Sequence, residues 1–255
     1  MNICLFSQEE FLKPIPKNDE RAQHLLKILH KKEGDSFTAG MIDGQSGIAT
    51  ITKIAENIEY SFEPLGNGKI LTPLKMIIGF PRPIQLKRLL RDIAALGICE
   101  VHLTGTELGE KSYMQSNLVE KGSAYKMLLD GTVQAGSTHV PKLFLYKTLK
   151  ECLDFCEKES ESDEILKIAL DNKNPDCSLQ KGLENSLNYD CKKSCNQRKS
   201  VFAAIGSERG WTDNERKILG NYGYIRCGMG ERIMRTETAA TAAGAIILNK
   251  LGFLD

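Results

Sequence analysis

Two successive strand, glycine-loop and helix patterns in the C-terminal part of the chain constrain its fold most strongly. The first begins with the apolar run Val201 to Ile205, typical of a buried strand, and ends at the glycines of residues 206–210. The second begins with Tyr224 to Cys227 and ends at Gly228-Met229-Gly230. Buried strands that alternate with helices are typical of α/β proteins, whose loops at one sheet edge form ligand sites. The sequence therefore predicts an α/β fold with a ligand site at both loops.

Polar side chains flank these loops. Thr212 and Glu215 have the spacing of a capping box, which predicts a helix start. After the second loop, Arg232, Arg235 and Glu237 precede a helix rich in Ala, Thr and Gly. Two arginines so soon after a glycine turn are poorly suited to a core, so we expect them at the ligand site. Ordinary salt bridges are the alternative.

The same segment resembles the RsmE family, in two motifs that have the family's order and spacing. The first motif is Ile205-Gly206-Ser207-Glu208-Arg209-Gly210-Trp211. The second is Met229-Gly230-Glu231-Arg232-Ile233-Met234-Arg235-Thr236-Glu237-Thr238-Ala239. Upstream, Pro81-Arg82-Pro83 and Glu110-Lys111-Ser112-Tyr113 also resemble one branch of the family. The resemblance covers nearly the whole chain except residues 171–200.

This resemblance implies an S-adenosylmethionine-dependent enzyme that methylates N3 of a uridine in 16S ribosomal RNA and so takes part in rRNA processing. It implies a SPOUT-type α/β domain with a trefoil knot over residues 74–255, preceded by a PUA-like RNA-binding domain over residues 1–70. It also implies a homodimer. The small-residue helix after Glu237 suits either threading through a knot or close packing, and both predict burial.

The residues themselves support only part of this domain description. Asn67-Gly68 lies between two prolines and indicates a boundary, and Asp43-Gly44 between apolar alternations predicts a hairpin. A small β domain with a basic helix at Asp19 to His30 is therefore expected before the boundary. The apolar run Ile165 to Leu170 predicts a further strand. Residues 171–200, which follow it, are polar with little periodicity, which predicts a surface insertion.

The resemblance assigns the site residues. We expect Arg235, with Arg232 second or as a phosphate clamp, to stabilise negative charge on the uridine carbonyl oxygens. Glu237 either accepts the N3 proton or orients an arginine. The residues expected to bind the cofactor are Ile205, Gly206, Glu208, Gly210, Cys227, Gly228, Met229, Gly230, Ile233, Met234 and Thr238.

Charge is distributed unevenly, although the formal net charge is only +1. Basic side chains gather in two groups, whereas residues 151–164 are strongly acidic. A basic face could contact RNA phosphates, although a solvated helix side explains the same charges. The residues expected to bind RNA are Lys27, His30, Arg82, Lys87, Arg88 and Arg209.

Three positions depart from the family pattern. Ser207 stands in place of the usual Pro, Arg209 in place of the usual Gly, and Ser137 where many members carry a charge. Arg209 would strain the loop if its φ were positive, and otherwise offers a contact to phosphate. These departures motivate a second hypothesis, a related SPOUT enzyme acting on another RNA. A third hypothesis is a non-catalytic RNA-binding factor for ribosome assembly.

The chain has eight cysteines, of which Cys152 and Cys156 are four positions apart, as are Cys191 and Cys195. Zinc sites usually have CxxC-type spacing, so we expect reduced structural or surface thiols and no metal ion. No apolar run is long enough to span a membrane, and the N-terminal residues do not resemble a secretory signal. We therefore expect a cytoplasmic protein without a membrane partner.

Overall fold

The computed structural model describes residues 2–114, 122–158, 165–187 and 200–254. It consists of two compact units. Unit 1 contains residues 1–71 and 129–140, and unit 2 contains residues 72–128 and 141–255. The predicted N-terminal domain of residues 1–70 thus lacked one segment, because residues 129–140 belong to the same unit. No helix in the described ranges combines the length and hydropathy that a membrane span requires.

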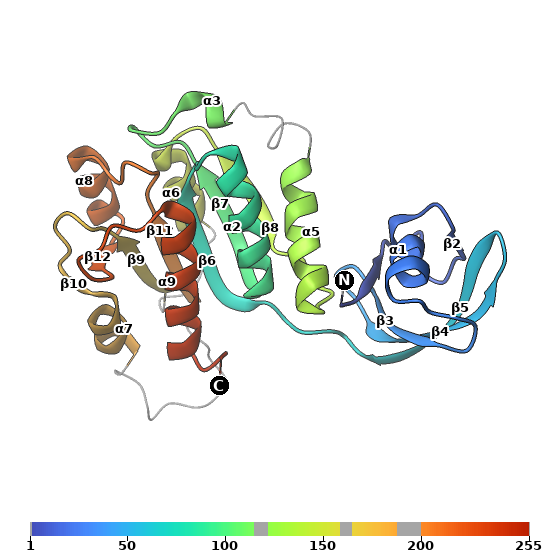
Figure 1. The fold of residues 1–255 in the computed structure, drawn as a ribbon. Coiled ribbons are helices and arrows are strands. Elements are labelled where there is room, and N and C mark those ends of the chain that lie inside the picture. The colour runs from blue at the N-terminus through green and yellow to red at the C-terminus, as the bar shows by residue number, and fades with distance from the viewer. Residues whose placement is uncertain (1, 115–121, 159–164, 188–199, 255) are drawn as a thin grey trace. The chain divides into compact units, whose positions relative to one another are not determined.

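Unit 1 is built on a five-stranded sheet in the order β1-β3-β4-β5-β2 (Figure 1). The hairpin of β3 and β4 turns at Asp43, whose φ of 56° is tolerated by Asp in turns. Leu25 packs with Phe6 and Ile51 in a core shared by helix and strands. The fold fits the predicted PUA-like barrel. Its strands are β1 (Cys4–Phe6), β2 (Ile15–Pro16), β3 (Ser36–Met41), β4 (Ser46–Ile54) and β5 (Asn57–Gly66).

The helix predicted over Asp19 to His30 forms with a change of type along its length. Asp19 caps α1 (Glu20–Gln23), because its side chain accepts a hydrogen bond from the Arg21 N–H. The chain then continues as the π-helix η1 (His24–Ile28). His30 ends the segment with a φ of 52°.

Unit 2 contains a seven-stranded sheet in its described residues, and all its strand pairs are parallel. The strand order is β10-β12-β9-β11-β6-β7-β8 (Figure 1). The predicted α/β fold is therefore confirmed. The strands are β6 (Thr72–Gly79), β7 (Ile98–Thr104), β8 (Lys142–Tyr146), β9 (Ile165–Leu170), β10 (Cys177–Ser178), β11 (Ser200–Ile205) and β12 (Ile225–Gly228).

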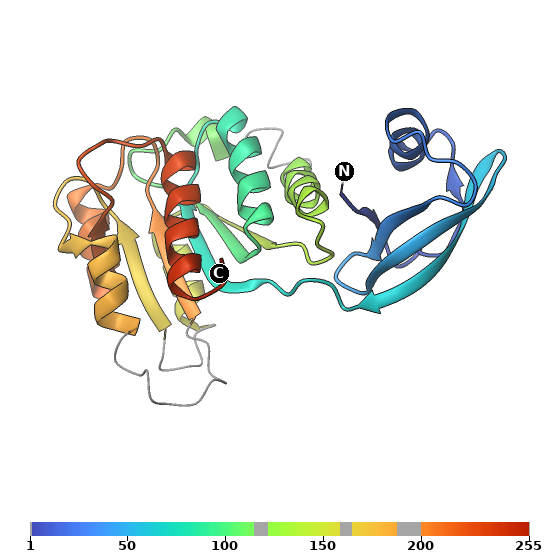
Figure 2. The same ribbon diagram turned by 60° about the horizontal axis from the view of Figure 1, so that its bottom comes forward.

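Helices cover both faces of this sheet (Figures 1 and 2). On one face α9 packs on α2 and α7, and on the other Cys152 of α6 and Leu219 of α8 join a core with Phe202. The described helices of unit 2 are α2 (Pro83–Ala95), α3 (Lys111–Met114), α6 (Leu149–Lys158), α7 (Leu179–Leu187), α8 (Asp213–Asn221) and α9 (Thr236–Lys250). A further helix, α5 (Ser123–Ala135), begins in unit 2 and ends in unit 1.

The C-terminal strands enter the sheet between strands that precede them in the sequence. β11 lies between β9 and β6, and β12 lies between β9 and β10. The predicted trefoil knot requires such late insertion. Helix α9 then packs closely: a Cβ added at Gly244 would lie 3.0 Å from Cε of Met76. The predicted burial of this small-residue helix is confirmed at Ala240, Ala243 and Gly244.

The prediction that residues 171–200 form a polar surface insertion was wrong for residues 177–187. β10 pairs with β12, so that Cys177 lies opposite Cys227 at the sheet edge. Helix α7 follows at once and buries Leu179 and Leu183. Residues 188–199 lie outside the described ranges. The segment escaped prediction because two buried leucines in nine residues give too weak a periodicity to indicate a helix.

Candidate functional site

A cleft of about 260 Å³ lies at the carboxyl ends of three neighbouring strands of unit 2. Leu170 ends β9, Ile205 ends β11, and Cys227 lies near the end of β12, and all three line the cleft. Strands β9, β11 and β12 are adjacent in the sheet although they are distant in sequence. The two glycine loops therefore meet at one edge of a parallel sheet, where α/β proteins bind ligands.

The first loop, residues 206–210, is a tight turn. The N–H of Gly210 donates to the carbonyl oxygen of Ser207 at 2.8 Å, and Gly210 has a φ of 70°. A Cβ at Gly206 would lie 3.0 Å from the carbonyl carbon of Gly210, so only glycine fits without displacement. The hydroxyl of Thr236 donates to the carbonyl oxygen of Gly206 at 3.2 Å. This bond fastens the first loop to the start of α9.

The second loop needs glycine for a different reason. Gly230 has a φ of 93°, and a Cβ added there would have nothing within 4 Å. The requirement is therefore conformational rather than steric, because side chains disfavour this backbone region. The loop leads through residues 231–235 to α9, for which Arg235 is the N-cap residue. The cleft thus lies beside the N-terminus of a helix.

Buried polar atoms mark this edge of the sheet. The hydroxyl oxygen of Ser207 is buried without a hydrogen-bond partner, and so is one carboxylate oxygen of Glu237. A buried polar atom without a partner is costly, and ligand atoms commonly satisfy it in functional sites. Asp171 is paired instead, with Arg216 at 2.5 and 3.1 Å. Burial opposes the ionisation of Asp171, but the bonds from Arg216 prevail and lower its pKa.

Most of the residues predicted to bind the cofactor line the cleft together. They are Ile205, Gly206, Glu208, Gly210, Cys227, Met229, Gly230, Ile233 and Met234. Gly228 and Thr238 are not among the lining residues. A Cβ at Gly228 would lie 3.0 Å from the ring of Pro175, so this glycine serves packing. Thr238 lies in the first turn of α9 and is exposed.

Several residues that line the cleft were not predicted from the sequence. Leu170, Asp171 and Asn172 come from the end of β9, and the others lie in or next to the two motifs: Ser207, Trp211, Thr236 and Ala239. The predicted strand at Ile165 to Leu170 was the signal for the first three, because residues that follow a buried parallel strand lie at the ligand edge. Trp211 donates from Nε1 to the carbonyl oxygen of Leu170 at 3.0 Å and so connects β9 to the first loop.

The three predicted catalytic side chains differ in their surroundings. Arg232 lines the cleft, whereas Arg235 is exposed and is not among the lining residues. Within the described ranges neither arginine forms a salt bridge, so the ordinary ion-pair interpretation has no support. Glu237 is half-buried and, in the same ranges, pairs with neither arginine.

The residues predicted to bind RNA are exposed in both units. Lys27 and His30 lie at the end of the helix in unit 1. In unit 2, Arg82 lies at the N-terminus of α2, and Lys87 and Arg88 follow on that helix. The backbone N–H of Arg82 donates to Glu208 at 3.1 Å, which connects α2 to the first glycine loop.

Arg209 does not strain its loop. Leu12, His30 and Asp43 are the described non-glycine residues with positive φ, so Arg209 has an ordinary backbone conformation. Its guanidinium group is exposed and lies 3.4 Å from a carboxylate oxygen of Glu110. Ser137 is buried and bonds to the carbonyl oxygen of Lys69 at 3.3 Å, so it has a structural role within unit 1.

Comparison with known proteins identifies close relatives. Residues 69–248 match the family model described as an RNA methyltransferase domain. The chain is 38% identical to ribosomal RNA small subunit methyltransferase E of Treponema pallidum, with 97% of this chain and 91% of the relative covered. It is 31% identical to ribosomal RNA small subunit methyltransferase E 1 of Borreliella burgdorferi, with 98% and 99% covered.

Solved structures share the fold over nearly the whole chain. The crystal structure of a ribosomal RNA small subunit methyltransferase E from Neisseria gonorrhoeae bound to S-adenosyl methionine aligns with a TM-score of 0.73 at 18% identity, covering 98% of this chain and 97% of that one. A probable rRNA-methyltransferase from Porphyromonas gingivalis aligns with a TM-score of 0.74 at 15% identity, covering 99% and 100%. Both likenesses extend over the two units of the chain.

Proposed function

We propose that this chain, which belongs to the ribosomal RNA small subunit methyltransferase E family, methylates N3 of a uridine in small-subunit ribosomal RNA with S-adenosylmethionine. One observation supports this function above the others. Both family motifs, distant from β9 in sequence, line a single cleft with the end of that strand. The relatives from Treponema and Borreliella carry the name of an enzyme that acts on the small subunit, and the solved relative from Neisseria is bound to this cofactor.

The cleft suits a nucleoside-containing cofactor. Its volume of about 260 Å³ lies just below the range of typical ligand pockets, about 300–1,000 Å³. Glycine backbone at residues 206, 210 and 230 leaves room for flat groups to approach N–H and C=O groups. The unpaired hydroxyl of Ser207 offers a further polar contact. We propose that the lining residues of the two loops hold the cofactor, which supplies an electrophilic methyl group when bound.

The substrate nitrogen determines what the protein must do. N3 of uridine carries a proton, and its loss leaves negative charge spread over N3 and the two neighbouring carbonyl oxygens. Arg235 is exposed and has no ion-pair partner among the described residues, so its guanidinium group is available to a carbonyl oxygen. We assign it the stabilisation of this charge, in the manner of an oxyanion hole. Arg232, at the cleft itself, is assigned a phosphate or cofactor contact.

We assign to Glu237 the role of accepting the proton that leaves N3. Its buried carboxylate oxygen has no hydrogen-bond donor, and neither arginine pairs with it in the described ranges. The orienting role expected from a Glu–Arg pair therefore has no contact to support it. A substrate N–H would satisfy the oxygen, and the carboxylate could then accept that proton as the N3–methyl bond forms.

The exposed basic residues of both units support RNA as the substrate. We assign phosphate contacts, which are sequence-independent and salt-dependent, to Lys27 and His30 in unit 1 and to Arg82, Lys87 and Arg88 in unit 2.

We also propose a homodimer. Ile84 of α2 is 61% exposed and Ile246 of α9 is 43% exposed, on helices that pack together. Light scattering should give twice the mass of one chain, and the mass of one chain would contradict the dimer.

The test is methyl transfer from radiolabelled S-adenosylmethionine to small ribosomal subunits that lack the modification, followed by mass spectrometry of the nucleosides. We expect 3-methyluridine at one position. Cofactor binding without transfer to these subunits would favour another RNA target, for which Arg209 would be the first residue to revert to Gly. Neither binding nor transfer would favour a non-catalytic assembly factor.

A further inference from the structure

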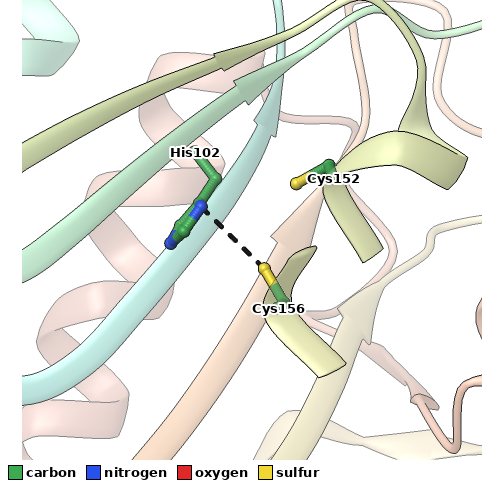
Figure 3. A group of neighbouring side chains, drawn as sticks. All are labelled: His102, Cys152 and Cys156. Carbon is green, nitrogen blue, oxygen red and sulfur yellow. Dashed lines mark hydrogen bonds between the residues drawn. The ribbon is translucent and has the colours of Figure 1, made fainter. Parts of the chain in front are cut away.

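Three metal-ligating side chains converge in the core of unit 2, remote in sequence from the two glycine loops (Figure 3). His102 comes from β7, and Cys152 and Cys156 come from α6. Their ligand atoms all lie within 4.8 Å of one another, and Sγ of Cys156 lies 3.8 Å from Nδ1 of His102. The sequence separates the histidine from the cysteines by about fifty residues, which is why no cluster was predicted.

The spacing on α6 suits a single ion. Residues four apart lie on the same helix face, one turn above the other, so that two side chains can reach one atom. Tetrahedral zinc with Zn–S bonds of about 2.3 Å and Zn–N bonds of about 2.0–2.1 Å would separate S and N ligand atoms by roughly 3.6 Å. The observed 3.8 Å is close to that separation.

The histidine is oriented as zinc-binding histidines are. Its Nε2 lies 3.2 Å from a carboxylate oxygen of Glu100, so Nε2–H donates to Glu100 and leaves the lone pair on Nδ1 facing the sulfur atoms. Lys75 holds Glu100 in turn, at 3.0 Å. A carboxylate behind a histidine ligand is the usual outer shell of a zinc site, because it fixes the tautomer and raises the basicity of the ligand.

The surroundings exclude water. The three residues are buried, with relative exposures of 1%, 0% and 4% for His102, Cys152 and Cys156. The imidazole stacks on Phe144 with a centroid distance of 4.8 Å, and Phe202 packs nearby. A divalent cation with two thiolates is electrically neutral, and Lys75 balances Glu100, so the assembly could be buried without net charge.

We propose that His102, Cys152 and Cys156 form a structural zinc site that fastens α6 to β7. The hydroxyl of Tyr146 lies 3.2 Å from Nδ1 of His102 and is the candidate for the fourth position. A closed site of this kind serves folding rather than catalysis, since structural zinc sites have four protein ligands. The site shares no residue with the cleft.

The chain offers an internal comparison. Sγ of Cys177 lies 3.8 Å from Sγ of Cys227, so this pair of thiols is as close as a metal would require. Within the described ranges, however, His102, Cys152 and Cys156 are the only metal-ligating side chains that form a cluster of three or more. Cys177→Ser is therefore a matched control for the loss of one thiol from a close pair.

The test is titration with cobalt(II), which occupies zinc sites and is visible by absorption. Reduced protein prepared without metal should bind one equivalent, with the d–d bands of a tetrahedral ion and sulfur-to-cobalt charge transfer. Zinc should displace the cobalt and raise the melting temperature. Absence of the charge-transfer band in the wild-type protein would overturn the proposal.

Variants locate the site. Cys156→Ser should weaken the charge-transfer band, whereas Cys177→Ser and the double variant C191S/C195S should leave the spectrum unchanged. Glu100→Gln keeps all ligands and should lower zinc affinity by about 10–100-fold. It therefore tests the site even if the cysteine variants fail to fold. A cobalt spectrum unaffected by Cys156→Ser, or zinc affinity unaffected by Glu100→Gln, would contradict the assignment.

Discussion

Arg232 and Arg235 are close in sequence but differ in their surroundings, so their substitutions should have different effects. Arg232 lines the cleft and Arg235 does not. Arg235→Ala should reduce turnover by about 100-fold or more while changing cofactor affinity only a few-fold, because a charge-stabilising donor acts mainly in the transition state. Arg232→Ala should weaken cofactor binding in calorimetry. Near-normal turnover of Arg235→Ala would remove that residue from the mechanism.

Gly230 should resist substitution because of its backbone conformation. Its φ of 93° is unfavourable for side chains, whereas the space around it is open. Gly230→Val should therefore abolish measurable cofactor binding by changing the loop, while the protein stays folded. Gly220→Ala is the control, because Gly220 lies in α8 with open space around it. The Gly220→Ala protein should bind the cofactor with normal affinity. Calorimetry that finds normal affinity for Gly230→Val would show that this loop does not hold the cofactor.

At the scale of elements, one buried ion pair joins α8 to the strand edge that carries the cleft. Asp171 follows β9, and its side chain is 1% exposed beside Arg216 of α8. Arg216 also pairs with Asp213 at 2.9 Å. Asp171→Asn should lower the free energy of unfolding by about 3 kcal/mol at neutral pH, because it leaves a buried guanidinium group partly unpaired. Urea denaturation measures this difference.

The pH dependence of that difference follows from the pKa of Asp171. Burial raises it, but the Arg216 bonds prevail, so the folded-state pKa lies below the ordinary value of about 3.9. The stabilisation is therefore fully present above that value and is lost as pH falls through the depressed folded-state pKa. The stability of the wild-type protein should therefore approach that of Asp171→Asn as the pH falls from about 4 through the folded-state pKa. A difference that stays constant down to acid pH would contradict the role of the carboxylate.

Local signals were sufficient for most elements around the cleft. The capping box of Thr212 and Glu215 is present, with both reciprocal hydrogen bonds, and the strand over Ile165 to Leu170 has the predicted bounds. β10 and α7 could not be predicted in this way. A two-residue strand is specified by pairing with β12 rather than by its own residues, and propensity has little influence on such pairing.

For the molecule as a whole, the two motifs were recognised in the sequence, but some of the residues that share the cleft with them were not predicted. Strand order brings β9 beside β11 and β12, which adds Leu170, Asp171 and Asn172 to the cleft. The same is true of His102 and the cysteines of α6, which only the fold brings together. Contacts between distant segments depend on topology, and no local periodicity encodes them. The resemblance to a family supplied the fold that periodicity alone could not.

The composition of unit 1 predicts the result of truncation. Residues 129–140 return to unit 1: the N–H of Asn2 donates to the carbonyl oxygen of Val133, and the hydroxyl of Thr138 donates to that of Gly44 at 2.8 Å. A chain that starts at Thr72 would leave Thr138 and Val140 without their buried surroundings. We expect fast hydrogen exchange over residues 129–140 in that truncated chain, and protection there in the full chain. Equal protection in both chains would show that this segment folds with unit 2 alone.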